Sequence, residues 1–230
     1  VFEGVPETLA AKQEAFARIC RLIPAEAILA STTSTILPGD LAAFATHPER
    51  VLNAHWLNPA FVIPLVELSA HAGTGHAAIE RLQRLLEHIG KVPVLCAAAP
   101  GYIVPRLQAL IMNEAARMVE EGVATPEDID RATRYGLGLR FAALGVIEFI
   151  DYGGNDILYH ASRYLAERLS RERFQAPPIV ERLMREGRNG LRSGEGFYDY
   201  RQRDVQAYRR DALARTLGQL RHAGLHRPPR

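Results

Sequence analysis

The sequence predicts two structural regions: an α/β layer over residues 1–98 and an all-helical region over residues 99–230. Up to residue 98, short β-rich runs alternate with patterns of helical spacing, an order typical of a largely parallel sheet covered by helices. After Pro100 and Gly101 the β-rich runs end, and apolar residues recur at helical spacing. We therefore place the boundary between the two regions at residues 98–101.

Four short β-rich runs predict the strands of the first region, each of a length typical of buried strands. Helical patterns separate these runs. The predicted strands are 27–32, 50–56, 64–69 and 92–97, and the predicted helices are 8–22, 38–45 and 75–89. Gly90 follows the last of these helices in the position of a C-cap, and the fourth strand begins directly after it.

The second region opens with a long amphipathic pattern that ends at Gly122. After this pattern, Thr125 is predicted to cap a helix, with Pro126 at the first helical position and Asp128 placed like the acid of a capping box. Further helical patterns run near 141–151, 154–169, 177–187 and 204–222. No β-rich run interrupts them, so the region is predicted to be all-helical.

Composition and charge exclude several classes of partner. The net charge of +2 is too small to predict binding to a nucleic acid or a membrane surface. No apolar run reaches the roughly 18 residues of a membrane span. The chain begins at Val1 in the middle of a pattern, so we expect its natural N-terminus to lie upstream.

The two cysteines, Cys20 and Cys96, are far apart and have no metal-ligand spacing around them. Both lie in apolar patterns, which favours buried free thiols over a disulfide. We therefore expect no metal site, and a reducing compartment such as the cytoplasm.

The run NAHWLNPAFVIPLVEL, residues 53–68, places His55 and Glu67 inside β-rich apolar segments. Ionisable side chains in such segments are costly unless they pair. A carboxylate that hydrogen-bonds one imidazole nitrogen fixes the tautomer and leaves the other nitrogen to accept a proton. The two residues are therefore either a structural contact or an acid–base pair, and their spacing alone does not decide between them.

Three other residues carry weaker signals. Ser34 follows a predicted strand, where a parallel sheet binds its ligands, but it also fits a turn that starts the next helix. Asn58 is suited to orient a cofactor amide or to form a turn with Pro59. Lys12 by itself is indistinguishable from a surface lysine. The phosphate-binding pattern G-x-G-x-x-G does not occur in the sequence.

Six segments, taken in order, resemble the 3-hydroxyacyl-CoA dehydrogenase superfamily: VFEGVPETLAAK, ILASTTS, HWLNP…PLVEL, GKVPV…PGYIV, NEAARMVEEGVATPEDID and SGEGFYDY. The resemblance reaches to about residue 200. It implies that residues 1–98 are the C-terminal half of a Rossmann-type NAD-binding domain without its Gly-rich fingerprint. Residues 99–230 would be a helical substrate and dimerisation domain, so the resemblance implies an NAD-dependent homodimer.

The resemblance also implies roles for individual residues. His55 matches the catalytic histidine, Glu67 matches the acid paired with it, and Ser34 matches the serine that binds the substrate oxygen. The positions expected to bind the cofactor are Glu7, Lys12, Thr32 and Asn58. Thr32 departs from the family pattern, because it stands in STTS where the family has an asparagine.

A second departure lies in PGYIVPR, where Pro105 replaces an active-site asparagine of the family. Proline has neither that amide side chain nor a backbone donor. The segment GLGLRFAALGVIEFIDYGG is nearer to the carnitine, gulonate and pyridine-carboxylate dehydrogenase branches. Arg140 in this segment either binds a substrate carboxylate through paired hydrogen bonds or is a surface residue.

The resemblance thus implies NAD-dependent oxidation of a small-molecule substrate, a short-chain 3-hydroxyacyl-CoA, to a 3-oxoacyl-CoA. One alternative is a dehydrogenase of a free hydroxy acid resembling carnitine or gulonate. Another is a non-catalytic relative of the lens-crystallin kind. We expect the 230-residue chain to be inactive by itself, because it lacks the phosphate-cradling turn.

Overall fold

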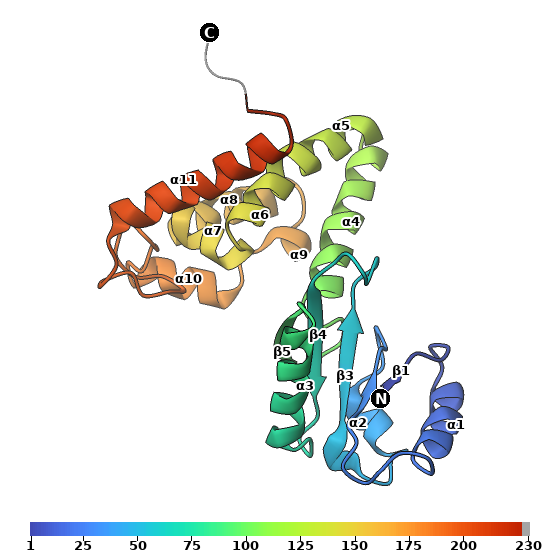
Figure 1. The fold of residues 1–230 in the computed structure, drawn as a ribbon. Coiled ribbons are helices and arrows are strands. Elements are labelled where there is room, and N and C mark those ends of the chain that lie inside the picture. The colour runs from blue at the N-terminus through green and yellow to red at the C-terminus, as the bar shows by residue number, and fades with distance from the viewer. Residues whose placement is uncertain (227–230) are drawn as a thin grey trace. The chain divides into compact units, whose positions relative to one another are not determined.

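The computed structural model describes residues 1–226. The chain divides into two compact units, Val1–Glu120 and Glu121–Arg230. The first unit holds all five strands of the sheet, and the second is built from helices (Figure 1). This is the α/β-plus-helical fold class that the sequence predicts. The long helix after the last strand belongs to the first unit.

The strands of the first unit form one sheet in the order β1-β2-β3-β4-β5. They are β1 (Phe2–Glu3), β2 (Leu29–Ser31), β3 (Val51–Trp56), β4 (Leu65–Ala70) and β5 (Val92–Ala97). Neighbouring strands are parallel except β3 and β4, which are antiparallel. The four predicted strands are confirmed. The two-residue β1 was not predicted, because it is too short to show a period.

Four α-helices belong to this unit: α1 (Leu9–Ile19), α2 (Pro38–Ala42), α3 (His76–His88) and α4 (Val104–Glu120). A short 3-10 helix, η1 (Pro48–Arg50), precedes β3. The hydroxyl of Thr8 caps α1 by accepting from the amide of Ala11 at 3.3 Å. Gly90 has a φ of 79° just after α3, so the glycine ends the helix as predicted.

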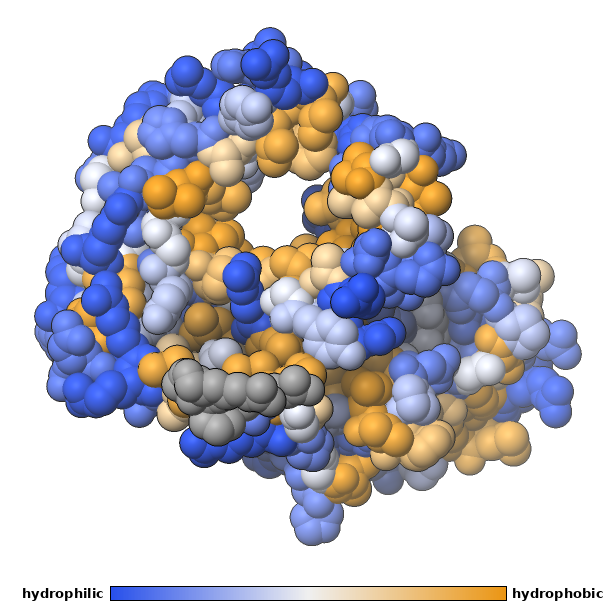
Figure 2. Space-filling view, turned by 90° about the horizontal axis from the view of Figure 1, so that it is seen from above, coloured by the Kyte–Doolittle hydropathy of each residue, from blue (hydrophilic) through white to orange (hydrophobic). Residues whose placement is uncertain are grey.

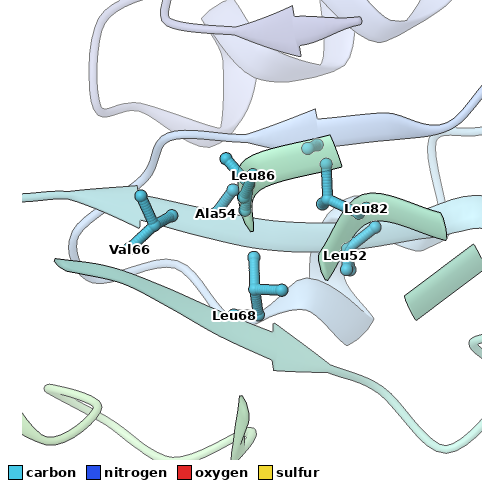
Figure 3. Packing of buried hydrophobic residues seen from close by; sticks show 7 residues of the cluster. Leu52, Ala54, Val66, Leu68, Leu82 and Leu86 are labelled. Carbon is cyan, nitrogen blue, oxygen red and sulfur yellow. The ribbon is translucent and has the colours of Figure 1, made fainter. Parts of the chain in front are cut away.

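The two faces of the sheet differ in character, because alternate residues of a strand point to opposite sides. On one face, apolar side chains of β2, β3 and β4 pack against α3. This cluster consists of Ala30, Leu52, Ala54, Val66, Leu68, Leu82 and Leu86 (Figure 3). On the other face, Leu29 and Val51 pack against Phe16 and Leu41 of α1 and α2.

The face that carries Val51 becomes polar toward the far end of β3. The alternation places Asn53 and His55 on this face, and they lie directly opposite Ser69 and Glu67 of β4. All four side chains are buried. A buried polar row in an otherwise apolar sheet requires internal partners, and the partners of Asn53, His55 and Glu67 define the site described below.

The second unit contains seven α-helices within its described residues and one π-helical turn, η2 (Thr133–Gly138). The α-helices are α5 (Pro126–Ala132), α6 (Leu139–Ala143), α7 (Val146–Gly153), α8 (Asn155–Arg168), α9 (Arg171–Phe174), α10 (Pro178–Arg185) and α11 (Val205–His222). The hydroxyl of Thr125 accepts from the amide of Asp128 at 3.2 Å, which confirms the predicted cap. The short α9 was not predicted.

The helix expected over residues 141–151 is wrong, because the chain breaks there between α6 and α7. Leu144 leaves the helix with an extended backbone. Gly145 then begins α7, and its amide donates to a carboxylate oxygen of Glu148 at 3.1 Å. The apolar spacing continues across this break, so the sequence pattern alone did not reveal it.

Asp151 fixes the segment SGEGFYDY within the second unit. Its buried carboxylate accepts from the amides of Phe197 at 3.0 Å and Tyr198 at 2.8 Å. A Cβ at Gly196 would lie 2.2 Å from Asp151 Oδ1, and one at Gly190 would lie 2.2 Å from the Asp151 carbonyl. Only glycine fits at these two positions, so this motif serves the packing of the helical unit.

Cys20 and Cys96 are both free thiols, and both are half-buried rather than buried. In the part of the chain that the structure describes, no helix is both long and apolar enough to cross a membrane. Large apolar side chains nevertheless reach the surface, and Leu110 and Met112 of α4 are 63% and 66% exposed. Apolar patches lie between polar side chains in the space-filling view (Figure 2).

Candidate active site

His55 and Glu67 form the centre of the site in the first unit. They are directly opposite each other on β3 and β4, and Nδ1 of His55 lies 2.9 Å from Oε2 of Glu67. The Glu67 side chain is fully buried, whereas that of His55 keeps 10% of its surface exposed. The structure thus brings the two predicted residues together, with only the imidazole open to a ligand.

The second carboxylate oxygen of Glu67 binds the start of α4. Oε1 accepts from the amides of Ile103 at 2.9 Å and Val104 at 2.8 Å. Amides at a helix N-terminus favour a negative charge, so they hold Glu67 as a carboxylate. Because a carboxylate only accepts, Nδ1 of His55 must be the donor, which leaves Nε2 as the proton acceptor.

Tyr102 completes the site from the loop before α4. Its ring lies 5.4 Å from the His55 ring, centroid to centroid, with the planes 32° apart. The hydroxyl donates to the carbonyl of Thr33 at 3.1 Å and accepts from Nδ2 of Asn53 at 2.8 Å. Burial raises the pKa of Tyr102 to about 12, so the hydroxyl stays protonated. We did not predict this residue from the sequence.

Glu7 organises the loop that follows β2. Its Oε1 accepts from the amides of Ser34 and Thr35, each at 3.0 Å, and from the hydroxyl of Thr33. Partial burial raises the pKa of Glu7, but the hydrogen bonds from Thr33 and Thr35 and the charge of Lys12 outweigh it. The resulting pKa is about 2. Glu7 is therefore a charged anchor for the loop that carries Ser34.

Lys12 is not a surface lysine, because only 1% of the residue is exposed. Its Nζ lies 3.1 Å from both carboxylate oxygens of Glu3 and 3.5 Å from Oε2 of Glu7. Ser31 donates to the same Glu3 carboxylate at 2.6 Å. The ammonium thus supports the site from beneath through Glu7, and a direct contact between Lys12 and a cofactor stays a prediction.

Two positions expected to bind the cofactor, Thr32 and Asn58, lie beyond the ends of parallel strands, and so does Ser34, which is expected to bind the substrate oxygen. Thr32 and Ser34 follow β2, and Asn58 follows β3, so all three lie toward the edge at which these strands end. Thr32 is half-buried, whereas Ser34 and Asn58 are exposed. The side chain of Glu7 is 39% exposed at the same edge. Exposed hydroxyl, amide and carboxylate groups suit the hydroxyls and amide of a nicotinamide nucleoside, so these residues fit the expected NAD.

Two further residues singled out in the sequence lie on helices, Arg140 on α6 and Pro105 on α4. Arg140 is exposed on α6 of the second unit, where its guanidinium stacks over Phe149 at 5.6 Å from the ring centroid. It belongs to a different compact unit from His55. Pro105 is the second residue of α4, where a missing amide hydrogen is harmless, directly after Val104.

No metal centre accompanies these residues: over residues 1–226, no cluster of His, Cys, Asp and Glu is arranged to hold an ion. The site offers one imidazole, one fixed carboxylate and the hydroxyl groups at the strand edge. Such a set suits proton transfer to or from a bound alcohol.

Comparison with known proteins identifies relatives of this chain. Residues 1–99 match the 3-hydroxyacyl-CoA dehydrogenase NAD binding domain, and residues 101–200 match the C-terminal domain of the same family. The solved structure of the 3-hydroxyacyl-CoA dehydrogenase of Archaeoglobus fulgidus is similar, with a TM-score of 0.84 and 35% identity. The match covers 98% of this chain and 77% of that one.

Curated relatives include proteins with different described activities. The 5-formyl-3-hydroxy-2-methylpyridine 4-carboxylate 5-dehydrogenase of Mesorhizobium japonicum is 33% identical over 90% of this chain and 67% of its own. The human lambda-crystallin homolog is 37% identical over 70% of this chain and 51% of its own. The chain thus spans about half to two thirds of the length of these relatives. It belongs to the 3-hydroxyacyl-CoA dehydrogenase family.

Proposed function

We propose that the protein is an NAD-dependent oxidoreductase that interconverts a short-chain 3-hydroxyacyl-CoA and a 3-oxoacyl-CoA. The single observation that carries this proposal is the His55–Glu67 pair, with the carboxylate fixed by the first amides of α4. A structural histidine has no need of a partly exposed imidazole beside such an anchored carboxylate. The family membership supports the same reaction class.

In the oxidative direction, Nε2 of His55 takes the proton of the substrate hydroxyl. Glu67 holds the imidazole in the tautomer that leaves Nε2 free and stabilises the imidazolium that forms. The hydroxyl of Ser34 binds the substrate oxygen. Bound NAD supplies the acceptor for the hydride that leaves the same carbon. In reduction, His55 returns the proton to the oxygen.

The residues proposed to bind the cofactor lie at the edge of the sheet where the parallel strands end. Glu7, Thr32 and Asn58 present a carboxylate, a hydroxyl and an amide to the ribose and nicotinamide end of NAD. Lys12 contributes beneath them by placing its charge 3.5 Å from Oε2 of Glu7. A carboxylate whose pKa is about 2 remains an acceptor for ribose hydroxyls throughout the functional pH range.

A second candidate substrate is a free hydroxy acid. The pyridine carboxylate dehydrogenase relative favours it, together with the exposed guanidinium of Arg140. The reaction and the roles of His55 and Glu67 would be unchanged. If this candidate holds, Arg140→Ala should raise the KM for the free acid about tenfold or more, because a charge-assisted pair is lost. Arg163→Ala, on an exposed helix face, is the matched control.

The proposal is tested by NADH formation in the complete protein with four substrates in parallel: L-3-hydroxybutyryl-CoA, carnitine, gulonate and a small 3-hydroxy acid. Turnover of the thioester alone supports the acyl-CoA reaction and shows that Pro105 is tolerated. Turnover of a free acid alone would support the alternative, a dehydrogenase of free hydroxy acids. NAD binding without turnover of any of the four contradicts the proposal and favours the crystallin-like alternative.

We also infer that the protein acts as a homodimer in the cytoplasm. The exposed apolar side chains of α4 support an association surface, and the two free thiols are in keeping with a reducing compartment. Light scattering of the complete protein should give twice the mass of one chain. A monomer across the micromolar range would contradict the dimer.

A further inference from the structure

We infer that Tyr102 is a positioning residue that holds the ring of His55 and the loop carrying Ser34 in one fixed relation. This inference rests on the proposed function, in which His55 moves the proton and Ser34 binds the substrate oxygen. The buried hydroxyl of Tyr102 is already bonded to the carbonyl of Thr33 and to Nδ2 of Asn53, so Tyr102 acts through its neighbours rather than by touching the substrate.

The ring of Tyr102 supports the imidazole. The two rings lie 5.4 Å apart with their planes tilted by 32°, and His55 is itself buried within the sheet. Glu67 fixes one edge of the imidazole through Nδ1, and the phenol ring lies against it from the α4 side. Together these two contacts restrict both the direction and the tilt of the imidazole ring.

The hydroxyl of Tyr102 fixes the loop after β2. It donates to the carbonyl of Thr33 at 3.1 Å, directly before Ser34. It also accepts from Nδ2 of Asn53, which in turn donates to the carbonyl of Ile36 at 2.8 Å. The loop is therefore bound on both sides of Ser34 through one phenol oxygen and one amide.

The backbone of Tyr102 is held in an unusual conformation. Its φ is 45°, a region that non-glycine residues seldom occupy, and it follows Gly101, whose φ is 77°. The next two residues, Ile103 and Val104, give their amides to Glu67. The turn that orients the Glu67 carboxylate therefore also aims the phenol at His55 and Thr33.

The test compares Tyr102→Phe, which keeps the ring and removes the hydroxyl, with Tyr164→Phe on an exposed helix face as the matched control. We expect Tyr102→Phe to fold and to raise the KM for the hydroxy substrate roughly three- to tenfold, the effect of losing the hydrogen bond that the hydroxyl donates to the loop at Thr33. The KM for NAD should stay unchanged. Tyr102→Leu, which also loses the ring, should lower kcat in addition.

A double-mutant cycle with Ser34→Ala identifies the route of the effect. If the hydroxyl acts through the Ser34 loop, Tyr102→Phe causes no further loss once Ser34→Ala is present. Additive losses in the two variants would overturn the inference. So would a wild-type KM in Tyr102→Phe.

A readout without catalysis separates this inference from the proposed function. Amide hydrogen exchange at Ser34 and Thr35 should accelerate in Tyr102→Phe and stay unchanged in Tyr164→Phe. If the wild-type protein forms no NADH but the amides respond in this way, the proposed function fails while the link between Tyr102 and the loop stands. Unchanged exchange in Tyr102→Phe would overturn the link, whatever the protein catalyses.

Discussion

Glu67 holds His55 with one carboxylate oxygen while the first amides of α4 hold the other. Oε2 lies 2.9 Å from Nδ1 of His55, and Oε1 accepts from Ile103, which is 36 residues further along the chain. The orientation of the imidazole thus depends on how the loop before α4 is placed against the sheet. An acid–base pair anchored in this way keeps its geometry without help from a ligand.

Glu67→Gln tests the charge of this anchor without changing its shape. The Gln carbonyl suits the amides of Ile103 and Val104, so its NH2 group should face His55 and force Nδ1 to become an acceptor. The proton then moves to Nε2, and the general base is lost. We expect NADH formation to fall about 10²–10⁴-fold while the fold is kept. Glu80→Gln, on the exposed face of α3, is the control. Near wild-type turnover in Glu67→Gln would contradict the assigned tautomer.

Glu7→Gln tests the electrostatic role of the loop anchor through stability. The pKa of Glu7 lies at about 2, below its ordinary value of 4.5, so the folded state favours the charged form. The stabilisation is therefore complete above pH 4.5 and is lost as the pH falls through about 2. Urea unfolding should show this loss in the wild type.

In Glu7→Gln the free energy of unfolding should be lower than in the wild type at neutral pH. The difference between the two proteins should narrow as the pH falls from 4.5 toward 2, because the wild type then loses the same charge. A difference that stays constant over this range would show that the carboxylate is not titrating with a lowered pKa.

Much of the site could be predicted from the sequence. The parts that could not be predicted depend on contacts between residues that are far apart in the chain. His55 and Glu67 stand inside β-rich runs, where a charged residue needs a partner, so the pair was predictable. The role of Tyr102 was not, because it depends on where a loop far along the chain folds back onto the sheet. The burial of Lys12 could not be predicted either, because only the three-dimensional position of Glu3 distinguishes its ammonium from that of a surface lysine.

The same distinction holds for the fold: elements set by local sequence could be predicted, and features set by distant contacts could not. The four predicted strands follow from local composition, and the helix cap at Thr125 follows from local chemistry. The break at Leu144 and the short β1 depend on packing and pairing partners that lie elsewhere in the chain. Arg140 belongs to a different compact unit from His55, so neither sequence spacing nor local structure relates it to the site.

Asp151→Ala tests the structural role assigned to the SGEGFYDY segment. The substitution removes the buried carboxylate that accepts from the part-buried amides of Phe197 and Tyr198. Each hydrogen bond to a charged group contributes about 1.5–3 kcal/mol, so we expect the free energy of unfolding to fall by at least about 2 kcal/mol. Asp211→Ala, at an exposed position of α11, should leave it almost unchanged. Equal unfolding midpoints for the two variants would show that this anchor does not stabilise the unit.

His55 is proposed to move the proton in an NAD-dependent oxidation, and the His55→Ala variant of the complete protein is the direct test of this role. NADH formation should be measured for the wild type, for His55→Ala and for His76→Ala, whose side chain is 84% exposed on α3. We predict that His55→Ala folds normally and loses about 10²–10⁴-fold in rate, whereas His76→Ala keeps the wild-type rate. Survival of the wild-type rate in His55→Ala would contradict the role assigned to His55.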